Sequence, residues 1–345
     1  MSDLLSIESH VNERAWDDQI AAAGGSVFHT SAWAAYGAAE RPGSRPLFVR
    51  LASRDGALRA AAVVFELRSS RWWLGPFSGE QWTDSYPVAA SGDEGAAAEL
   101  IRALAAQDRG AVELTIGSFG STRGGVDLRS LGFETWDRLE FEIQLDPPEE
   151  AIFGAMDKIR RQKIRKAEKR AIVVADLTLP QGLLDLRRLQ AESAARITGR
   201  GGPQIGRAAD ADADPVRILV ERGAGRIVGA LLDGECVSAG FFTRFGDLVY
   251  YTLSGHDARG LESQAPTLLL WETMKRYRGE GARRFNLGGC SASAQRPDSP
   301  EHGVYNYKKD FGSVVSTCVS GRQILRPVVH RLLSRLRGSQ AKGAS

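Results

Sequence analysis

The stretch GRIVGALLDGECVSAGFFTRFGDLVYYTLSG, residues 225–255, contains three runs of β-branched, aliphatic and aromatic residues, separated by the short turns DGE and FGD. This pattern predicts three consecutive strands that form an antiparallel meander: 225–233, 235–245 and 247–255. The sequence APTLLLWETMKRYRGEG, residues 265–281, then predicts a helix. ARRFNLGG, residues 282–289, predicts one more strand.

With the rest of the chain included, the second half repeats the plan of the first half. Upstream of the meander we expect helices at 149–156, 158–170 and 182–197, a strand at 172–177 and a polar, Gly-rich loop at 199–215. In the first half we expect helices at 12–23, 31–39 and 92–107, and strands at 46–52, 58–67, 71–77, 111–117 and 139–145. The sequence therefore predicts an α/β (α+β) fold of two similar domains, with mixed sheets flanked by helices.

The length and composition agree with a globular protein of two domains. A chain of 345 residues exceeds what one hydrophobic core usually organises, and Pro147 and Pro148 break the chain between the strand at 139–145 and the helix at 149–156. We expect domains at 1–148 and 149–311. No apolar run approaches the ~20 residues that span a bilayer, and the first residues do not resemble a secretory signal, so we expect a cytoplasmic protein.

The three cysteines are odd in number and far apart. Cys236, Cys290 and Cys318 are accompanied by five histidines, and their spacing fits neither a disulfide framework nor a zinc site. We therefore expect three buried or semi-buried thiols and no metal.

The charge of the chain is concentrated in one segment. Residues 157–170, DKIRRQKIRKAEKR, carry eight basic residues against two acidic ones, although the whole chain has a formal charge of only +3. In a helix, Ile159, Ile164, Ala167 and Ala171 would lie near one side and the basic residues would cover the rest. Such a surface favours binding of a polyanion, because binding releases the counterions of its phosphates. The alternative is an ordinary solvated helix face. Few aromatic residues are interleaved, which favours phosphate contact over base stacking.

The order of elements resembles the N-acetyltransferase (GNAT) superfamily, with two copies in tandem. Several segments resemble the FemABX family of aminoacyl-tRNA-dependent transferases: RRQKIRKAEKR at 160–170, APTLLLWETMKRYRGEGARRFNLGG at 265–289, GVYNYKKDFG at 303–312 and FHTSAW at 28–33. The second segment has Asn286 where the family has an acid, and the third places Lys308 at the family's lysine. By analogy, the strand at 313–321 would complete the first domain, making residues 312–338 part of it.

The resemblance implies a transferase that moves an amino acid from aminoacyl-tRNA to an amine and forms an amide bond. The amine would belong to a peptidoglycan precursor or a small natural product, and aminoacyl-tRNA would be a co-substrate with no further cofactor. The basic segment would hold the tRNA through Lys158, Arg161, Lys163, Arg165, Lys166 and Lys169.

The second domain contains most of the site residues that we expect. Lys308 lies among aromatic residues, where an ammonium could hold an anionic group or stabilise an oxyanion, and Tyr305 and Tyr307 would line the substrate site. Strand alternation places Tyr250 and Tyr251 on opposite faces, and we assign Tyr251 to the cleft together with Asn286. His256 is placed where a general base could act, but a loop histidine is more often merely exposed.

In the first domain, GPFSGEQWTDSYP at 75–87 corresponds to part of the family's acceptor cleft, so Asp84 and Tyr86 would bind the acceptor. The alternative is a plain loop packed over Trp82 and Tyr86.

Two other functions stay open. GNAT enzymes that use acetyl-CoA have a Gln/Arg-x-x-Gly-x-Gly/Ala segment before the helix, where backbone amides hold the pyrophosphate, and GHDARGLESQAPT at 255–267 has no such pattern. This absence weighs against a coenzyme A donor, but a coenzyme A-dependent N-acyltransferase acting on a sugar or polysaccharide intermediate stays one alternative. A non-catalytic RNA-binding module is the other. The basic helix expected at 326–338 is more typical of packing than of lipid attachment.

Overall fold

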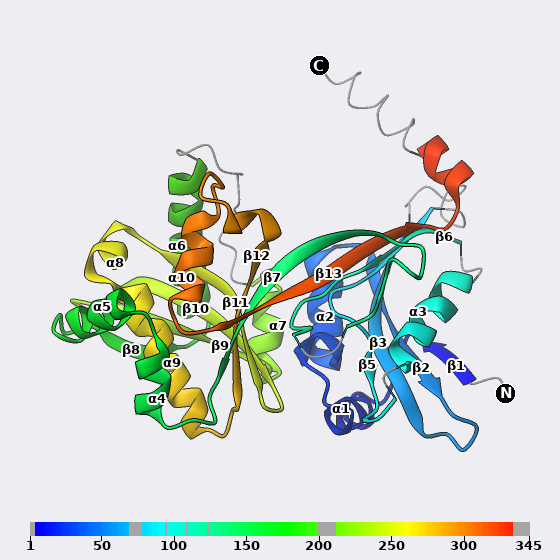
Figure 1. Ribbon diagram of the computed structural model, residues 1–345, viewed down its shortest axis with the longest axis horizontal. Helices are drawn as coiled ribbons and strands as arrows, with labels where there is room; N and C mark the ends of the chain where they lie inside the picture. Colours follow the sequence, from blue (N-terminus) through cyan, green and yellow to red (C-terminus); the bar gives the residue numbers. More distant parts are fainter. Residues whose placement is uncertain are drawn as a thin grey trace. The chain divides into compact units, whose positions relative to one another are not determined.

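The computed structural model describes residues 4–68, 78–93, 95–107, 110–122, 125–198 and 212–333 (Figure 1). The chain divides into two compact units, Met1–Arg138 with Cys318–Ser345, and Leu139–Thr317. The mixed α/β fold class expected from the sequence is confirmed. The domain limits at 148 and 311 stay a prediction. The strand expected at 71–77, most of the loop at 199–215 and the end of the C-terminal helix lie outside the described residues.

The first unit contains a mixed sheet. Its strands follow the spatial order β1 (Leu4–Glu8), β2 (Ser44–Ala52), β3 (Leu58–Leu67), β4 (Gly79–Thr83), β6 (Ala111–Ile116) and β13 (Val314–Ile324), and β5 (Val88–Ala89) pairs with β3. The β4–β6 pair is parallel, and the other pairs with a described register are antiparallel. The C-terminal strand thus pairs with β6, about 200 residues earlier in the chain.

Helices and a buried apolar face complete the first unit. They are α1 (Glu13–Ala22), the 3₁₀ turn η1 (Val27–His29), α2 (Ser31–Glu40) and α3 (Ala96–Ala106). The side chain of Asn12 caps α1, and that of Thr30 caps α2 by accepting the backbone N–H of Trp33. Leu100, Ile101 and Leu104 of α3 pack on the sheet residues Leu47 and Val64.

The second unit also contains strands of a mixed sheet. Its strands follow the order β7 (Glu134–Gln144, from Leu139 onward in this unit), β12 (Arg284–Ser291), β11 (Leu248–His256), β10 (Glu235–Phe245), β9 (Gly225–Leu232) and β8 (Val173–Leu177). The meander predicted from residues 225–255 is present as β9, β10 and β11, paired antiparallel. Strand β12 joins β11 in parallel.

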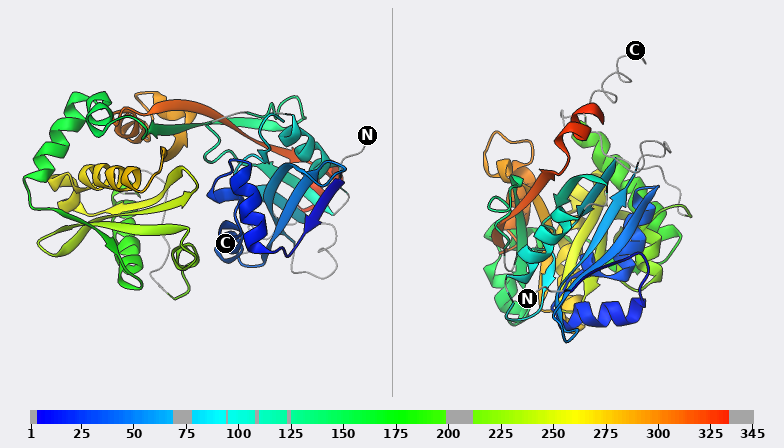
Figure 2. Two further views of the ribbon diagram at one scale, coloured as in Figure 1. Left: turned by 90° about the horizontal axis from the view of Figure 1, so that it is seen from below. Right: turned by 90° about the vertical axis from the view of Figure 1, so that its right-hand side faces the viewer.

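Helices cover both faces of the sheet in this unit. They are α4 (Glu149–Ala155), α5 (Lys158–Glu168), α6 (Gln181–Thr198), α7 (Val216–Glu221), α8 (Ala258–Ser263), α9 (Ala265–Gly279) and α10 (His302–Lys309), with the 3₁₀ turn η3 (Ala292–Gln295). Helices α6 and α9 lie on opposite faces of the sheet, and α5 packs on α9 (Figure 2).

The structure corrects the predicted face of the basic helix. Ile164 and Ala167 are buried as expected, but Ile159 is 60% exposed. The buried position one turn before Ile164 belongs to Arg160, which is only 4% exposed. Positions 160, 164 and 167 form the i, i+4, i+7 stripe of one helix face, so an arginine occupies a core position.

Two other expectations can be compared with the described residues. All three cysteines are buried and free, as predicted. Within the described residues, no helix is both long and apolar enough to cross a membrane.

Candidate active site

Strands β11 and β12 separate partway along their length. They pair only at Leu248–Arg284, Val249–Phe285 and Tyr250–Asn286, although β11 continues to His256 and β12 to Ser291. The β10–β11 ladder also slips here, because Phe241 pairs with Leu253 but Phe242 pairs with Tyr251. The extra residue, Thr252, makes a β-bulge, which bends a strand and re-aims its side chains. The last pair, Tyr250 and Asn286, therefore marks the point from which the two strands diverge.

Asn286 shapes the divergent half of β12. Its side chain is fully buried, and its Oδ1 accepts a hydrogen bond of 2.7 Å from the backbone N–H of Gly288. Gly288 has a φ of +72°, a conformation that glycine adopts without strain. A methyl group at Gly288 would lie 3.1 Å from the carbonyl oxygen of Tyr251, 3.5 Å from Lys308 Nζ and 3.8 Å from the hydroxyl of Tyr250. Several polar groups therefore converge on this glycine.

Lys308 reaches the same place from the last turn of α10. Its Nζ donates a hydrogen bond of 2.9 Å to the carbonyl oxygen of Gly289 and lies 5.8 Å from the ring centroid of Phe141. The side chain is half-buried. The aromatic setting expected for this lysine is present, with Tyr305 in edge contact with Phe141 at 5.7 Å. The structure thus brings Lys308, Asn286 and Tyr305 into one region.

The two consecutive tyrosines of β11 have different surroundings. The ring of Tyr251 stacks on Phe242 at 4.8 Å, and burial raises the pKa of its hydroxyl. Tyr250 is 6% exposed and donates a hydrogen bond of 3.1 Å to Oε1 of Glu140, which is fully buried. The tyrosine hydroxyl beside Gly288 and Lys308 is therefore that of Tyr250, and Tyr251 contributes its backbone carbonyl.

Sequence reasoning did not single out Glu140. A signal was present in the strand LEFEIQL, where Glu140 and Glu142 alternate with Leu139, Phe141 and Ile143. Two carboxylates inside a strand with such an apolar face are expected to need partners. Glu142 has one in Arg284, whose Nε and Nη2 lie 3.1 and 3.0 Å from its two oxygens.

Tyr307 belongs to the contact between α5 and α10. The guanidinium of Arg160 lies over its ring, and burial raises the pKa of the Tyr307 hydroxyl despite the opposing charge of Arg160. Arg160 also donates to the carbonyl oxygen of Tyr307 at 3.2 Å and to Asp310 Oδ2 at 3.4 Å. The backbone N–H of Asp157 donates to the carbonyl oxygen of Asp310. The first turn of the basic helix is thus fixed to the helix that carries Lys308.

The outer face of α5 holds the residues predicted to bind tRNA. Lys158, Arg165, Lys166 and Lys169 are exposed, and Arg161 and Lys163 are half-buried. Arg161 donates to the carbonyl oxygen of Gly154, and Arg165 lies 5.5 Å from the ring of Phe153. Among the described residues, neither the three lysines of this helix nor Lys169, which follows it, forms an ion pair.

The segment between β11 and α9 folds as a short helix, α8, that the sequence pattern did not predict. The carboxylate of Asp257 caps it by accepting the backbone N–H of Gly260 at 2.6 Å. A side chain at Gly260 would overlap the carbonyl oxygen of Val237. Pro266, in the first turn of α9, has no N–H to offer a ligand. A negative side chain therefore stands where a coenzyme A pyrophosphate would require backbone donors.

His256 ends β11 without a catalytic arrangement. Its backbone N–H donates to Ser193 Oγ at 3.0 Å, and its carbonyl oxygen accepts hydrogen bonds from Ser193 and Arg196. Burial, with the nearby charge of Arg196, lowers the pKa of its imidazole to about 4. At neutral pH this group is a weak base, which does not favour the general-base role considered for it.

Comparisons with known proteins agree with this geometry. Residues 158–309 match the family model of the acetyltransferase (GNAT) domain. The crystal structure of FemX is similar over 96% of this chain and 99% of its own, with a TM-score of 0.75 and 16% identity. The fold is that of FemX.

Other structures share this FemX-like fold more distantly. A tandem GNAT protein from the clavulanic acid biosynthesis pathway covers 93% of this chain and 99% of its own, at a TM-score of 0.53 and 13% identity. The structure of L-PGS from Bacillus licheniformis covers 94% of this chain and 96% of its own, at a TM-score of 0.54 and 15% identity. No curated protein matches the sequence.

The FemX-like fold places the two predicted acceptor residues, Asp84 and Tyr86, in the first unit. Trp33 Nε1 donates to Asp84 Oδ2 at 2.8 Å, and burial raises the pKa of this carboxyl against the opposing effects of Trp33 and Arg41. The hydroxyl of Tyr86 donates to the carbonyl oxygen of Val319 and accepts its N–H at 3.2 Å. Burial raises the pKa of Tyr86 to about 12. These contacts favour a packing role for Tyr86, and its acceptor role stays a prediction.

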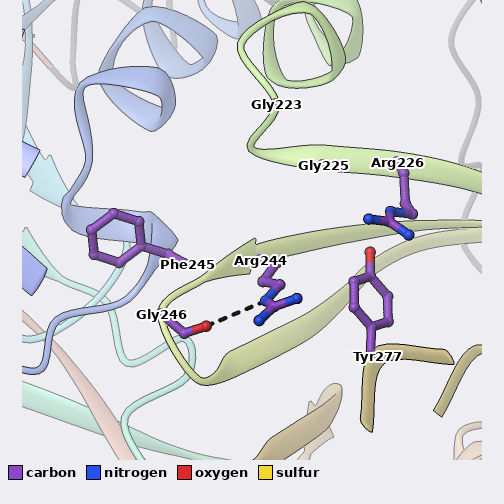
Figure 3. A pocket seen from close by; sticks show the side chains of 7 residues that line it. All are labelled: Gly223, Gly225, Arg226, Arg244, Phe245, Gly246 and Tyr277. Carbon is purple, nitrogen blue, oxygen red and sulfur yellow. Dashed lines mark hydrogen bonds between the residues drawn. The ribbon is translucent and has the colours of Figure 1, made fainter. Parts of the chain in front are cut away.

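A pocket of about 470 Å³ in the second unit contains none of the predicted site residues. Figure 3 shows the side chains that line it: Gly223, Gly225, Arg226, Arg244, Phe245, Gly246 and Tyr277. Its two guanidiniums are held by Glu280, at 2.7 Å from Arg226 and 3.3 Å from Arg244. Arg244 also donates to the carbonyl oxygen of Gly246. Because these donors already have partners, the pocket gives no indication of an anionic ligand.

Proposed function

We propose that this protein is an acyltransferase that moves an aminoacyl group from aminoacyl-tRNA to an amine and forms an amide bond. Three features support the proposal: the divergence of β11 and β12, the ammonium group of Lys308 beside it, and the lysine-rich face of α5. The FemX-like fold and the GNAT domain at residues 158–309 agree with acyl transfer.

The chemistry needs little beyond positioning and charge stabilisation. The ester of an aminoacyl-tRNA is already activated, so the reaction requires no ATP. The amine attacks the ester carbonyl, and negative charge develops on its oxygen. Lys308 Nζ, held by the carbonyl oxygen of Gly289, would stabilise that oxyanion or hold an anionic group of the acceptor. Asn286 would act by fixing the backbone of Gly288, which keeps the space beside Nζ open.

The observation that carries the choice of donor is the charge on α5. Many basic side chains elsewhere in this unit are paired with a carboxylate, for example Arg276 with Asp176 and Arg284 with Glu142. Among the described residues, Lys158, Lys163, Lys166 and Lys169 have no carboxylate partner. Unpaired lysines on one helix face favour a phosphate backbone, because binding releases its condensed counterions.

A coenzyme A-dependent N-acyltransferase is the second candidate. The match to the acetyltransferase domain family favours it. The α8 segment weighs against it, because Asp257 caps the helix at which a pyrophosphate would be expected to bind.

A donor assay tests the proposal. Purified protein is incubated with tRNA charged with mixed radiolabelled amino acids, or with radiolabelled acetyl-CoA. The amine probes are a UDP-linked muramoyl pentapeptide with a side-chain amine and a panel of small polyamines. We expect an amide product from the charged tRNA that disappears after RNase treatment. An RNase-resistant product from acetyl-CoA alone would instead support the second candidate. Binding of tRNA without product from any amine would support a binding module.

Two neighbouring lysines provide a matched pair for the same assay. Lys308→Ala should lower kcat by about 10²–10³-fold, the usual loss when one oxyanion-stabilising group is removed, and leave tRNA affinity intact. Lys309→Ala is the control, because this exposed lysine lies over Tyr305 on α10 and does not reach Gly289. Equal effects of the two substitutions would argue against the role of Lys308.

A further inference from the structure

We propose that Tyr250, supported by Glu140, accepts the proton that the attacking amine loses and returns it to the ribose oxygen of the leaving tRNA. The inference rests on the aminoacyl-transfer function proposed above. It adds a catalytic residue, Tyr250, and a residue that acts through it, Glu140.

The first argument is the position of the hydroxyl. Tyr250 is the last residue of β11 that pairs with β12, so its side chain stands at the point of divergence. Its hydroxyl and Lys308 Nζ lie 3.8 and 3.5 Å from the same point, the position that a side-chain carbon of Gly288 would take. A substrate carbonyl beside Nζ would therefore have its attacking amine within reach of this hydroxyl.

The second argument is the environment of Glu140. Its carboxyl group is fully buried, and Oε1 accepts the Tyr250 hydroxyl at 3.1 Å. Glu142, two residues along β7, instead receives two guanidinium hydrogen bonds from Arg284. A guanidinium fixes a carboxylate in its charged form, whereas a phenol hydroxyl can pass its proton to a carboxylate. Of the two strand carboxylates, Glu140 is the one joined to a hydroxyl at the site.

The proton path is balanced. As the amine nitrogen bonds to the ester carbon, its proton moves to the oxygen of Tyr250, and the proton of Tyr250 moves to Glu140. The bond between the carbonyl carbon and the ribose oxygen then breaks, and its electron pair stays on that oxygen. Glu140 returns its proton to Tyr250, and Tyr250 gives one to the ribose oxygen. The products are an amide and an alcohol, and both side chains regain their starting forms.

Three substitutions test this assignment in the donor assay. Tyr250→Phe removes the hydroxyl, and Glu140→Gln keeps a hydrogen-bond acceptor for Tyr250 but cannot take a proton. We expect both to lower kcat by about 10²-fold or more, as for general acid–base groups, with the KM for charged tRNA unchanged. Glu140→Asp keeps the carboxylate and should recover part of the lost rate. Tyr277→Phe is the control, because it removes a hydroxyl from another buried tyrosine of this unit.

The outcomes separate the two proposals. If the wild-type protein forms no product from charged tRNA, the proposed function fails and this inference fails with it. If the wild type is active and Glu140→Gln stays within about threefold of it in kcat, the proton path is wrong while the function stands. If Tyr250→Phe does not fold, the Glu140→Gln and Glu140→Asp pair still decides. Equal losses in Gln and Asp variants, with lowered thermal stability in both, would show a purely structural role.

Discussion

The guanidinium carbon of Arg160 lies 4.2 Å from the ring centroid of Tyr307, and the same side chain donates to the carbonyl oxygen of Tyr307. The guanidinium carbon also lies 4.9 Å from the ring centroid of Phe311. Thr267 Oγ1 accepts a further hydrogen bond from Arg160 at 3.3 Å. One buried cation thus joins α5, which carries the unpaired lysines, to α10, which carries Lys308. Movement of α5 on binding a polyanion would be transmitted directly to α10.

Arg160→Lys tests whether the specific contacts of the guanidinium, and not its positive charge alone, join α5 to α10. A lysine keeps the positive charge but loses the planar fork and the ring contacts, so we expect the free energy of unfolding to fall by about 1–3 kcal/mol. We expect kcat to fall, because α10 loses its anchor beside Lys308, while tRNA affinity stays constant. Denaturant unfolding and the donor assay measure the two effects. Arg296→Lys is the control, since Arg296 is 69% exposed and pairs only loosely with Asp298. An unchanged kcat in Arg160→Lys would refute the link.

Reversal of two charges on α5 should weaken tRNA binding. We expect Lys163→Glu combined with Lys166→Glu to lower tRNA affinity and to reduce the salt slope by about 2, roughly one unit for each lost phosphate contact. Filter binding across a range of salt concentrations measures both quantities. Lys275→Glu is the comparison, because this lysine of α9 is already paired with Glu272 at 2.8 Å. If the double variant kept its affinity and slope, α5 would not be the tRNA-binding surface.

Gly288→Ala should damage activity more than stability. The positive φ of Gly288 alone costs an alanine about 1–2 kcal/mol. The added methyl group would also press on the Tyr251 carbonyl oxygen and enter the space beside Lys308 Nζ. Gly281→Ala is a close control, because Gly281 has a φ of +85° and no atom within 4 Å of the new carbon. We expect Gly288→Ala to melt slightly below Gly281→Ala, because only its methyl group meets the Tyr251 carbonyl oxygen, and a large loss of kcat only in Gly288→Ala. Equal activities would place the reacting groups elsewhere.

His256 should affect acid stability and not catalysis. The pKa of its imidazole is about 4 in the folded chain, against the ordinary value of 6.5 expected in the unfolded chain. Between these two pH values the unfolded chain binds a proton that the folded chain does not. The free energy of unfolding should therefore fall as the pH drops from about 6.5 to 4, by roughly 3 kcal/mol at most from this group. His29, whose pKa burial also lowers, adds to the same trend. His256→Gln should flatten this fall in urea titrations at several pH values and leave kcat unchanged. A variant as acid-sensitive as the wild type would contradict the assignment.

Much of the second unit could be predicted from the sequence because its elements are long and strongly patterned. Strand β10 has the limits expected from the turns DGE and FGD, and α9 and β12 follow as predicted. Short elements were missed: β1, β4 and α8 have five or six residues each. Such short runs carry too little periodicity to separate them from loops.

The sequence by itself determined the two-unit α/β plan, the concentration of charge on α5 and the free state of the cysteines. These properties follow from local patterns and composition. Only the tertiary structure decided that Arg160 is buried and Ile159 exposed, because the aromatic partners of Arg160 lie about 150 residues away in the chain. It also placed the hydroxyl of Tyr250, and not that of Tyr251, beside Gly288 and Lys308. Alternation along a strand puts the two on opposite faces, but which face holds Phe242 and which holds Glu140 depends on strands brought together by folding.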